Sequence, residues 1–88
     1  MIHQLNVVVN NFRRIIMATS QERLKKLRID KGITQKQMAE ILEMTVTGYQ
    51  YYEHGKREIS IKVLTTLADY FDVSTDYLLG RTDDPKRY

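Results

Sequence analysis

The sequence predicts an all-α fold built from short helices. Ser or Thr residues recur where a side-chain oxygen can cap a helix start, and Gly residues follow most of the helical stretches. Between them, apolar residues recur with a period near 3.6. Because 88 residues suffice for one core and not for two, we expect a single compact bundle of five helices.

The first two helices begin at capping boxes, in which a Thr and a Glu or Gln three residues later satisfy each other's backbone amides. Thr19 and Glu22 open the first, predicted over residues 19–31, and the same motif opens the second, over residues 34–42. Gly32 ends the first helix. The apolar residues expected on the inner sides of these helices are Leu24, Leu27, Met38, Ala39, Ile41 and Leu42.

Three further helices are predicted over residues 45–54, 60–71 and 74–79, each beginning at a Ser or Thr. Gly follows directly after the first and the last of them. The middle one carries a single apolar stripe formed by Val63, Leu64, Leu67, Ala68 and Phe71. The connections between the five helices are therefore short, as in a compact bundle.

The two ends of the chain differ from the helical domain, which we place at residues 18–80. Residues 1–17 are rich in β-branched side chains and lack a helix start, so they predict an N-terminal arm or short strand. Met17 directly precedes the first helix, so these residues also fit an extension upstream of the domain. Residues 81–88 show no periodicity and contain Pro85, which predicts a flexible C-terminal tail.

Composition excludes several classes of protein. The chain has no Cys, so disulfides and thiolate chemistry are excluded. No apolar run approaches the roughly 18 residues of a membrane span, so we expect no membrane span, no signal peptide and a cytoplasmic location. Two His and no Gly-rich phosphate loop or spaced metal ligands predict no enzyme, no metal and no cofactor. The acidic residues Asp69, Asp72 and Asp76 lack the spacing of a calcium loop.

The distribution of charge points to an anionic partner. The net charge is +3, and the excess of basic residues lies before Glu58. Residues 58–88 carry more acidic than basic side chains. A basic excess confined to part of a small domain favours a surface that meets nucleic acid there.

The functional signal lies in residues 34–58, TQKQMAEILEMTVTGYQYYEHGKRE. Two capped helices joined by so short a turn must cross steeply, which leaves the second exposed along one side and suited to a major groove. The chain resembles the Cro/cI-type family of repressors, also called the xenobiotic response element family, over residues 22–82. Three blocks match in order: RLKKLRIDKGITQKQMAEIL, YEHGKRE and LTTLADYFDVSTDYLLGRT.

This resemblance implies a lambda-repressor-like DNA-binding domain in which the helix 45–54 is the recognition helix. It also implies a transcriptional regulator, a repressor, that binds double-stranded DNA. One recognition helix reads only a few base pairs, so a homodimer on an inverted-repeat operator is expected. The family's usual dimer surface near the last helix points to Tyr77, Leu78, Leu79 and the arm, although Leu78 fits the core equally well.

Three residues depart from the family pattern. Glu43 replaces the usual Gly in the turn, and it is strained there if its φ is positive. Ile59 replaces a frequent Pro after the recognition helix. Tyr49 stands where a buried Ile or Val is commoner.

The 100° step between residues divides the recognition helix into two faces. Tyr49 and Tyr52 share one face, which we assign to the core. The outward residues, expected to contact bases, are Val46, Thr47, Gln50 and Tyr51. Gln50 can pair with adenine and Val46 can pack on a thymine methyl, and no Arg or Lys is present to read guanine, so we predict a preference for A·T pairs.

Phosphate contacts are expected from residues around that helix. The resemblance gives this role to Gln35 at the start of the second helix, where free amides assist. The full expected set is Gln35, Lys36, Thr45, Lys56 and Arg57. The resemblance also pairs Arg28 with Glu53, which would hold the recognition helix to the scaffold; the alternative is two unrelated surface charges.

A different class of function stays open. The chain also fits an antitoxin, or another protein-interaction module, whose main partner is an unrelated protein. The arm, with its strand potential, could then pair with that partner or with a second copy of the chain. DNA retention that depends on salt favours the regulator, whereas tight association with an unrelated protein favours the module.

Overall fold

The structure is a computed structural model that describes residues 20–88. All regular elements in this part of the chain are helices, so the expected all-α fold is confirmed. The first helical stretch covers residues 20–30. It is followed by α2 (Gln35–Ile41), α3 (Val46–Glu53), α4 (Ile61–Phe71) and α5 (Thr75–Leu78). The predicted cap Thr19 and the arm, residues 1–17, lie outside the described residues.

The predicted helix starts of α2 to α5 are confirmed. The side chains of Thr34, Thr45, Ser60 and Ser74 each accept a hydrogen bond from the backbone amide three residues later. At Thr34 the box is reciprocal, because the Gln37 side chain also accepts from the Thr34 amide at 2.9 Å. These bonds satisfy amides that have no partner within the helix. Local side-chain chemistry therefore sets where each helix begins.

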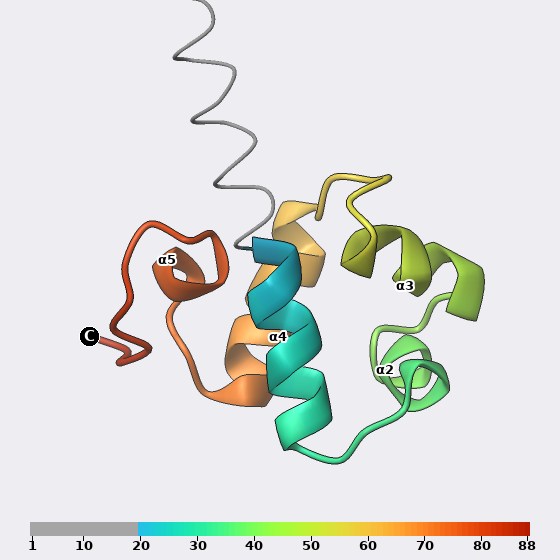
Figure 1. Ribbon diagram of the computed structural model, residues 1–88, viewed down its shortest axis with the longest axis horizontal. Coiled ribbons are helices and arrows are strands. Elements are labelled where there is room, and N and C mark those ends of the chain that lie inside the picture. The colour runs from blue at the N-terminus through green and yellow to red at the C-terminus, as the bar shows by residue number, and fades with distance from the viewer. Residues whose placement is uncertain (1–19) are drawn as a thin grey trace, which may run out of the picture.

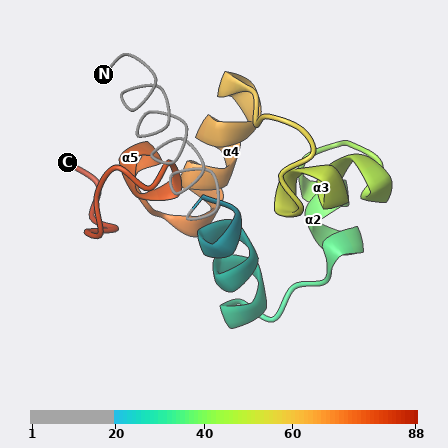
Figure 2. The ribbon, with the colours of Figure 1, turned by 45° about the horizontal axis from the view of Figure 1, so that its top comes forward.

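The helices form two groups on either side of the stretch 20–30. α2 packs against α3, and α4 packs against α5. Figures 1 and 2 show the α2–α3 unit at one side of the molecule and α5 with the C-terminal segment at the other. The outer side of the α2–α3 helix-turn-helix unit is thus free of the C-terminal half of the chain.

The core lies where the two groups meet. Its buried apolar residues are Leu24, Met38, Ala39, Tyr49, Tyr52, Leu67, Ala68, Val73 and Leu78. Tyr49 and Tyr52 are 0% and 3% exposed, which confirms their inward assignment. The expectation for Ile41 was wrong: it is 36% exposed, because its direction on α2 diverges from the face that Met38 and Ala39 turn to the core.

The C-terminal segment is tied to the domain by two arginines. Arg23 donates to the Tyr77 carbonyl at 2.7 Å and to the Thr82 carbonyl, and it pairs with Asp83. Arg87 donates to the carboxylate of Asp69 at 2.6 Å. The sequence predicts a flexible tail here, and these contacts join it to the first helix and to α4. They link residues far apart in sequence, so no local pattern announces them.

Helix α2 ends in a left-handed turn at a residue that is not glycine. Glu43 has a φ of 55°, and its amide donates to the Glu40 carbonyl while the Met44 amide donates to the Ala39 carbonyl. This is the Schellman pattern, in which glycine normally supplies the positive φ. The same pattern at the end of α3 uses Gly55, with a φ of 70°. The strain anticipated for Glu43 is therefore present.

Replacing Glu43 with Gly should stabilise the domain. An L-residue in the left-handed region costs about 1–2 kcal/mol, and glycine's extra chain entropy offsets about 0.5–1 kcal/mol of the relief. We expect Glu43→Gly to raise the free energy of unfolding by roughly 0.5–1 kcal/mol in urea titrations followed by circular dichroism. Glu40→Gly, within α2, is the control and should lower it by about 1 kcal/mol. A loss of stability in both variants would contradict the strain.

Candidate nucleic-acid interface

The crossing of α2 and α3 is built from local constraints at both ends of the turn. α2 has only seven residues and buries Met38 and Ala39. The strained turn at Glu43 then leads into Thr45, which caps α3 by accepting from the Gly48 amide at 3.1 Å. A short helix, a tight turn and a new cap leave the chain no freedom to continue α2. α3 therefore crosses α2 steeply, and Figure 1 shows α2 nearly end-on and α3 from the side.

The backbone leaves α3 through a glycine that lies close to the first helix. A Cβ on Gly55 would lie 1.8 Å from the Nε2 atom of Gln21 on the first helix. The residue also has a positive φ. The positive φ favours glycine at this position, whereas the close atoms belong to the flexible end of the Gln21 side chain, which can move aside.

A buried ion pair fixes α3 to the first helix. The Arg28 Nε atom lies 2.9 Å from Glu53 Oε2, and Nη2 lies 3.1 Å from Oε1, which makes the pair bidentate. Arg28 Nη1 also donates to the Ile33 carbonyl at 2.9 Å. The Glu53 side chain is 1% exposed and that of Arg28 is 11% exposed. The hydrogen bonds to Glu53 raise the pKa of Arg28 above its usual value. The pair that the family resemblance implies is present.

The hydroxyl of Tyr49 is buried beside this pair. The residue is 0% exposed, and its Oη atom has no hydrogen-bond partner among residues 20–88. Burial, and then the nearby negative charge of Glu53, raise the pKa of Tyr49 far above its usual value of about 10. An aliphatic residue would fill this place without an unpaired polar atom, so the departure from the family pattern has a cost.

The outward face of α3 is open to an incoming partner. Thr47 is exposed and Tyr51 is 43% exposed. Val46 and Gln50 are half-buried, and Val46 packs partly on the core. None of these four side chains is occluded within the chain. The structure thus brings the expected base-contacting residues together on one accessible surface.

A hydrogen bond that the sequence does not predict links α2 to this face. Gln50 Nε2 donates to Gln35 Oε1 over 3.1 Å. The bond leaves the Oε1 atom and the second N–H of Gln50 available, together with the amide nitrogen of Gln35. Nothing in the spacing of two glutamines 15 positions apart indicates this contact. It joins an expected phosphate-contacting residue to an expected base-contacting one.

Positive side chains lie near α3 without partners that would neutralise them, Lys56 beside the outward Tyr51 and Arg57 beside the inward Tyr52. Lys36, Lys56 and Arg57 are exposed, and none of them forms an ion pair within residues 20–88. The Nζ atom of Lys56 lies 5.9 Å from the centre of the Tyr51 ring. The Thr45 oxygen, by contrast, is engaged in capping α3. The arrangement suits a polyanion laid along α3.

Among residues 20–88 no group of three or more His, Asp or Glu side chains could hold a metal ion. No helix in this range is long and apolar enough to cross a membrane.

A short helix, a tight turn and a second helix with an open polar face, packed on three further helices, define a DNA-binding domain of the helix-turn-helix class. Comparison with known proteins agrees with this class. The helix-turn-helix family matches residues 24–78, and the chain belongs to this family, in its Cro/cI or xenobiotic response element type. No solved structure matches the chain.

The relatives are regulators from bacteria. The SPbeta prophage-derived uncharacterized HTH-type transcriptional regulator YonR of Bacillus subtilis (strain 168) is 51% identical over 61 residues, which cover 69% of this chain and 56% of the relative. YqaE of the same strain is 47% identical over 65 residues, covering 74% and 56%. ImmR is 38% identical over 66 residues, covering 75% and 52%. The chain spans about half the length of these curated relatives.

Removing one partner of the buried ion pair should destabilise the domain strongly. Arg28→Met leaves the Glu53 carboxylate buried and uncompensated, so we expect the free energy of unfolding to fall by about 3 kcal/mol in urea titrations. The double variant Arg28→Met with Glu53→Leu should recover most of this loss. Arg87→Met, at the exposed pair with Asp69, is the control and should change stability by less than about 1 kcal/mol. Equal losses for both arginines would contradict the assigned role.

Removing the unpaired hydroxyl of Tyr49 should stabilise the domain. We expect Tyr49→Phe to raise the free energy of unfolding by about 1 kcal/mol at neutral pH, with Tyr51→Phe unchanged. Because the folded-state pKa is raised, the unfolded chain releases this proton first, near pH 10, and stability is lost as the pH rises above that value. The advantage of Tyr49→Phe should therefore grow above pH 10 in unfolding titrations across pH. A variant less stable than the natural chain at neutral pH would show that the hydroxyl is hydrogen-bonded.

Proposed function

We propose that this chain is a cytoplasmic, sequence-specific DNA-binding repressor that inserts α3 into the major groove of an operator. Residues 18–80 form the binding domain, with residues 1–17 as an arm and residues 81–88 as a tail. Two findings support this assignment: the chain belongs to the helix-turn-helix family, and its relatives are named as transcriptional regulators.

The observation that carries the proposal is the contrast between the two faces of α3. The inner face is fully buried at Tyr49 and anchored through Glu53. The outer face carries an exposed Thr47 and Tyr51, and Lys56, which forms no ion pair within residues 20–88, lies beside Tyr51. A helix held rigidly on one side and open on the other presents its side chains to a groove without reorganisation.

The bond between Gln35 and Gln50 supports a specific reading of the base contacts. Gln50 retains one acceptor and one donor, the pattern that pairs with N6 and N7 of adenine. Gln35 retains amide protons for a backbone phosphate. Val46, at the start of α3, offers a methyl surface for thymine. We therefore propose that the sequence-specific contacts favour A·T pairs.

We propose that the chain acts as a homodimer on an inverted repeat. Two recognition helices must lie about 34 Å apart to read one face of the duplex, and a twofold axis achieves this. Of the expected dimer residues, Leu78 is only 4% exposed and belongs to the core. Tyr77 is half-buried beneath the Arg23 guanidinium, which lies 4.3 Å from its ring centre. Leu79, 36% exposed, remains available for a partner copy.

Selection from randomised duplexes, followed by affinity measurements across salt concentrations, tests the proposal. The natural chain should select an inverted repeat with A·T pairs under Gln50. Gln50→Ala should reduce discrimination at that position by about 1–3 kcal/mol, or roughly 5- to 150-fold. Lys56→Gln should weaken all sequences alike and reduce the salt slope by about 0.9. Lys86→Gln, in the tail on the opposite side of the molecule, is the control and should change neither.

The same measurements separate the regulator from a protein-interaction module. A discrete footprint that weakens with salt, together with a native mass of two chains, supports the regulator. An invariant guanine core under Val46 and Thr47 would contradict the predicted readout. Absence of DNA retardation together with tight co-purification of an unrelated protein would replace the regulator with the module.

A further inference from the structure

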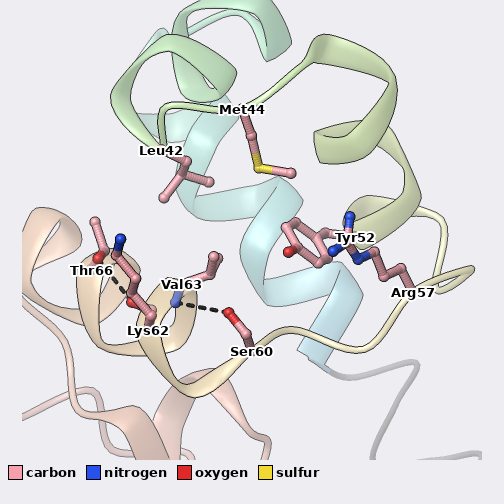
Figure 3. A pocket seen from close by; sticks show the side chains of 8 residues that line it. All are labelled: Leu42, Met44, Tyr52, Arg57, Ser60, Lys62, Val63 and Thr66. Atoms are coloured by element: carbon pink, nitrogen blue, oxygen red, sulfur yellow. Dashed lines mark hydrogen bonds between the residues drawn. The ribbon is translucent and has the colours of Figure 1, made fainter.

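The side of α3 that faces away from its open surface borders a cavity of about 270 Å³. The cavity lies between the helix-turn-helix unit and α4, as Figure 3 shows. Its apolar walls come from Leu42 and Met44 around the turn and from Val63 on α4. The remaining lining residues are Tyr52, Arg57, Ser60, Lys62 and Thr66.

The fold already uses two of the polar groups in this lining. The Ser60 hydroxyl caps α4 by accepting from the Val63 amide at 3.2 Å. The Thr66 hydroxyl donates to the Lys62 carbonyl at 2.8 Å. Both bonds are drawn in Figure 3. These two hydroxyls therefore do not call for a ligand.

The Tyr52 hydroxyl is not used by the fold. The residue is 3% exposed, and its hydroxyl makes no hydrogen bond within residues 20–88. In Figure 3 this oxygen points from α3 into the space in front of Val63. The hydroxyl oxygen itself is not fully buried, so it opens to the cavity as an unpaired donor.

Two cations at the cavity are also without a partner. Neither Arg57 nor Lys62 forms an ion pair within residues 20–88, and residues 1–19 contain no acidic side chain. Glu58, next to Arg57 in the chain, does not pair with it. The Arg57 guanidinium lies 5.6 Å from the Tyr52 ring centre. All three available polar groups can donate to an anion, and none can neutralise a cation.

We propose that this cavity binds a small carboxylic acid with an apolar body about the size of benzoate. The cavity holds the volume of roughly nine liquid waters at about 30 Å³ each, which limits the ligand to a single ring or short branched chain. The apolar body lies against Leu42, Met44 and Val63. The carboxylate accepts from Tyr52, and the flexible Arg57 and Lys62 side chains contribute positive charge from opposite sides of the cavity, as Figure 3 shows. Apolar walls with a few convergent polar groups are the usual composition of a small-molecule site.

The binding site does not depend on the proposed function, but its consequence does. Tyr52 belongs to α3 and Met44 to the turn before it, so a bound ligand contacts both α3 and this turn. Arg57 is also a proposed phosphate contact. A carboxylate that holds its guanidinium in the cavity withdraws it from DNA. We therefore infer that the ligand lowers the affinity for the operator.

Titration of the full 88-residue chain with sodium benzoate, followed by amide NMR shifts, tests the site without DNA. We expect saturable shifts centred on Met44, Tyr52 and Val63. Benzamide, which lacks the charge, and acetate, which lacks the ring, should each bind at least tenfold more weakly. Arg57→Gln and Lys62→Gln should each weaken benzoate by about twofold to fivefold, as expected for exposed ion pairs. Tyr52→Phe should also weaken it, and Lys25→Gln, on the exposed side of the first helix, should stay within twofold.

Two results would overturn the site. Inorganic phosphate or acetate binding as tightly as benzoate would show that the apolar walls contribute nothing and that the cations form a simple anion patch. Benzoate shifts distributed over lysines far from Val63 would show that the cavity is not the point of contact. Circular dichroism of each variant confirms folding, and all substituted cations are exposed, so loss of the fold does not obscure the outcome.

The regulatory consequence is tested separately with the selected operator at constant ionic strength. Saturating benzoate should weaken operator binding at least fivefold, within the usual range of coupling between two sites. In Arg57→Gln this effect should be reduced. Unchanged operator affinity with the cavity occupied would overturn the regulatory role and leave the site intact. If the chain binds no DNA at all, the proposed function fails, while the NMR titration still decides the site.

Discussion

The orientation of the outward face of α3 depends on the ion pair between Arg28 and Glu53. A carboxylate buried to 1% exposure is tolerable only with a compensating partner, and within residues 20–88 its ion-pair partner is Arg28 on the first helix. The pair therefore sets the rotation of α3 about its own axis. Once Glu53 and Tyr49 face inward, the 100° step places Thr47 and Tyr51 outward. A weaker ion pair would let α3 rotate about its own axis, so its outward side chains would no longer hold one orientation toward a groove.

Local chemistry explains why so much of the fold follows from the sequence alone. Each helix cap joins residues only three apart, so the sequence predicts it. The structure shows the predicted caps at Thr34, Thr45, Ser60 and Ser74. The inward position of Tyr49 and Tyr52 needs only the helical period. Ile41 shows the limit of this reasoning, because a seven-residue helix is too short for its apolar residues to define one side.

The contacts that the sequence does not predict are those between distant residues. The Gln35–Gln50 bond and the grip of Arg23 on the C-terminal segment both depend on the packing of different helices. Neither contact has a sequence signal, because its residues meet only when the helices pack. The roles of Gln35 and of the Arg28–Glu53 pair came from the family resemblance, and spacing alone left the pair as two unrelated charges.

A strained turn and two unpaired hydroxyls lie at α3, while the other left-handed residue that is not glycine, Asp72, follows α4. Glu43 takes a left-handed conformation just before it, and the hydroxyls of Tyr49 and Tyr52 lack partners on its inner side. The two hydroxyls differ in their surroundings: Tyr49 Oη is sealed in the core, whereas Tyr52 borders a cavity. The first lies beside the Arg28–Glu53 pair, whereas the second can be satisfied by a ligand that enters the cavity. Because Tyr52 also anchors the inner face of α3, whatever satisfies its hydroxyl acts directly on the helix that presents Gln50 and Tyr51.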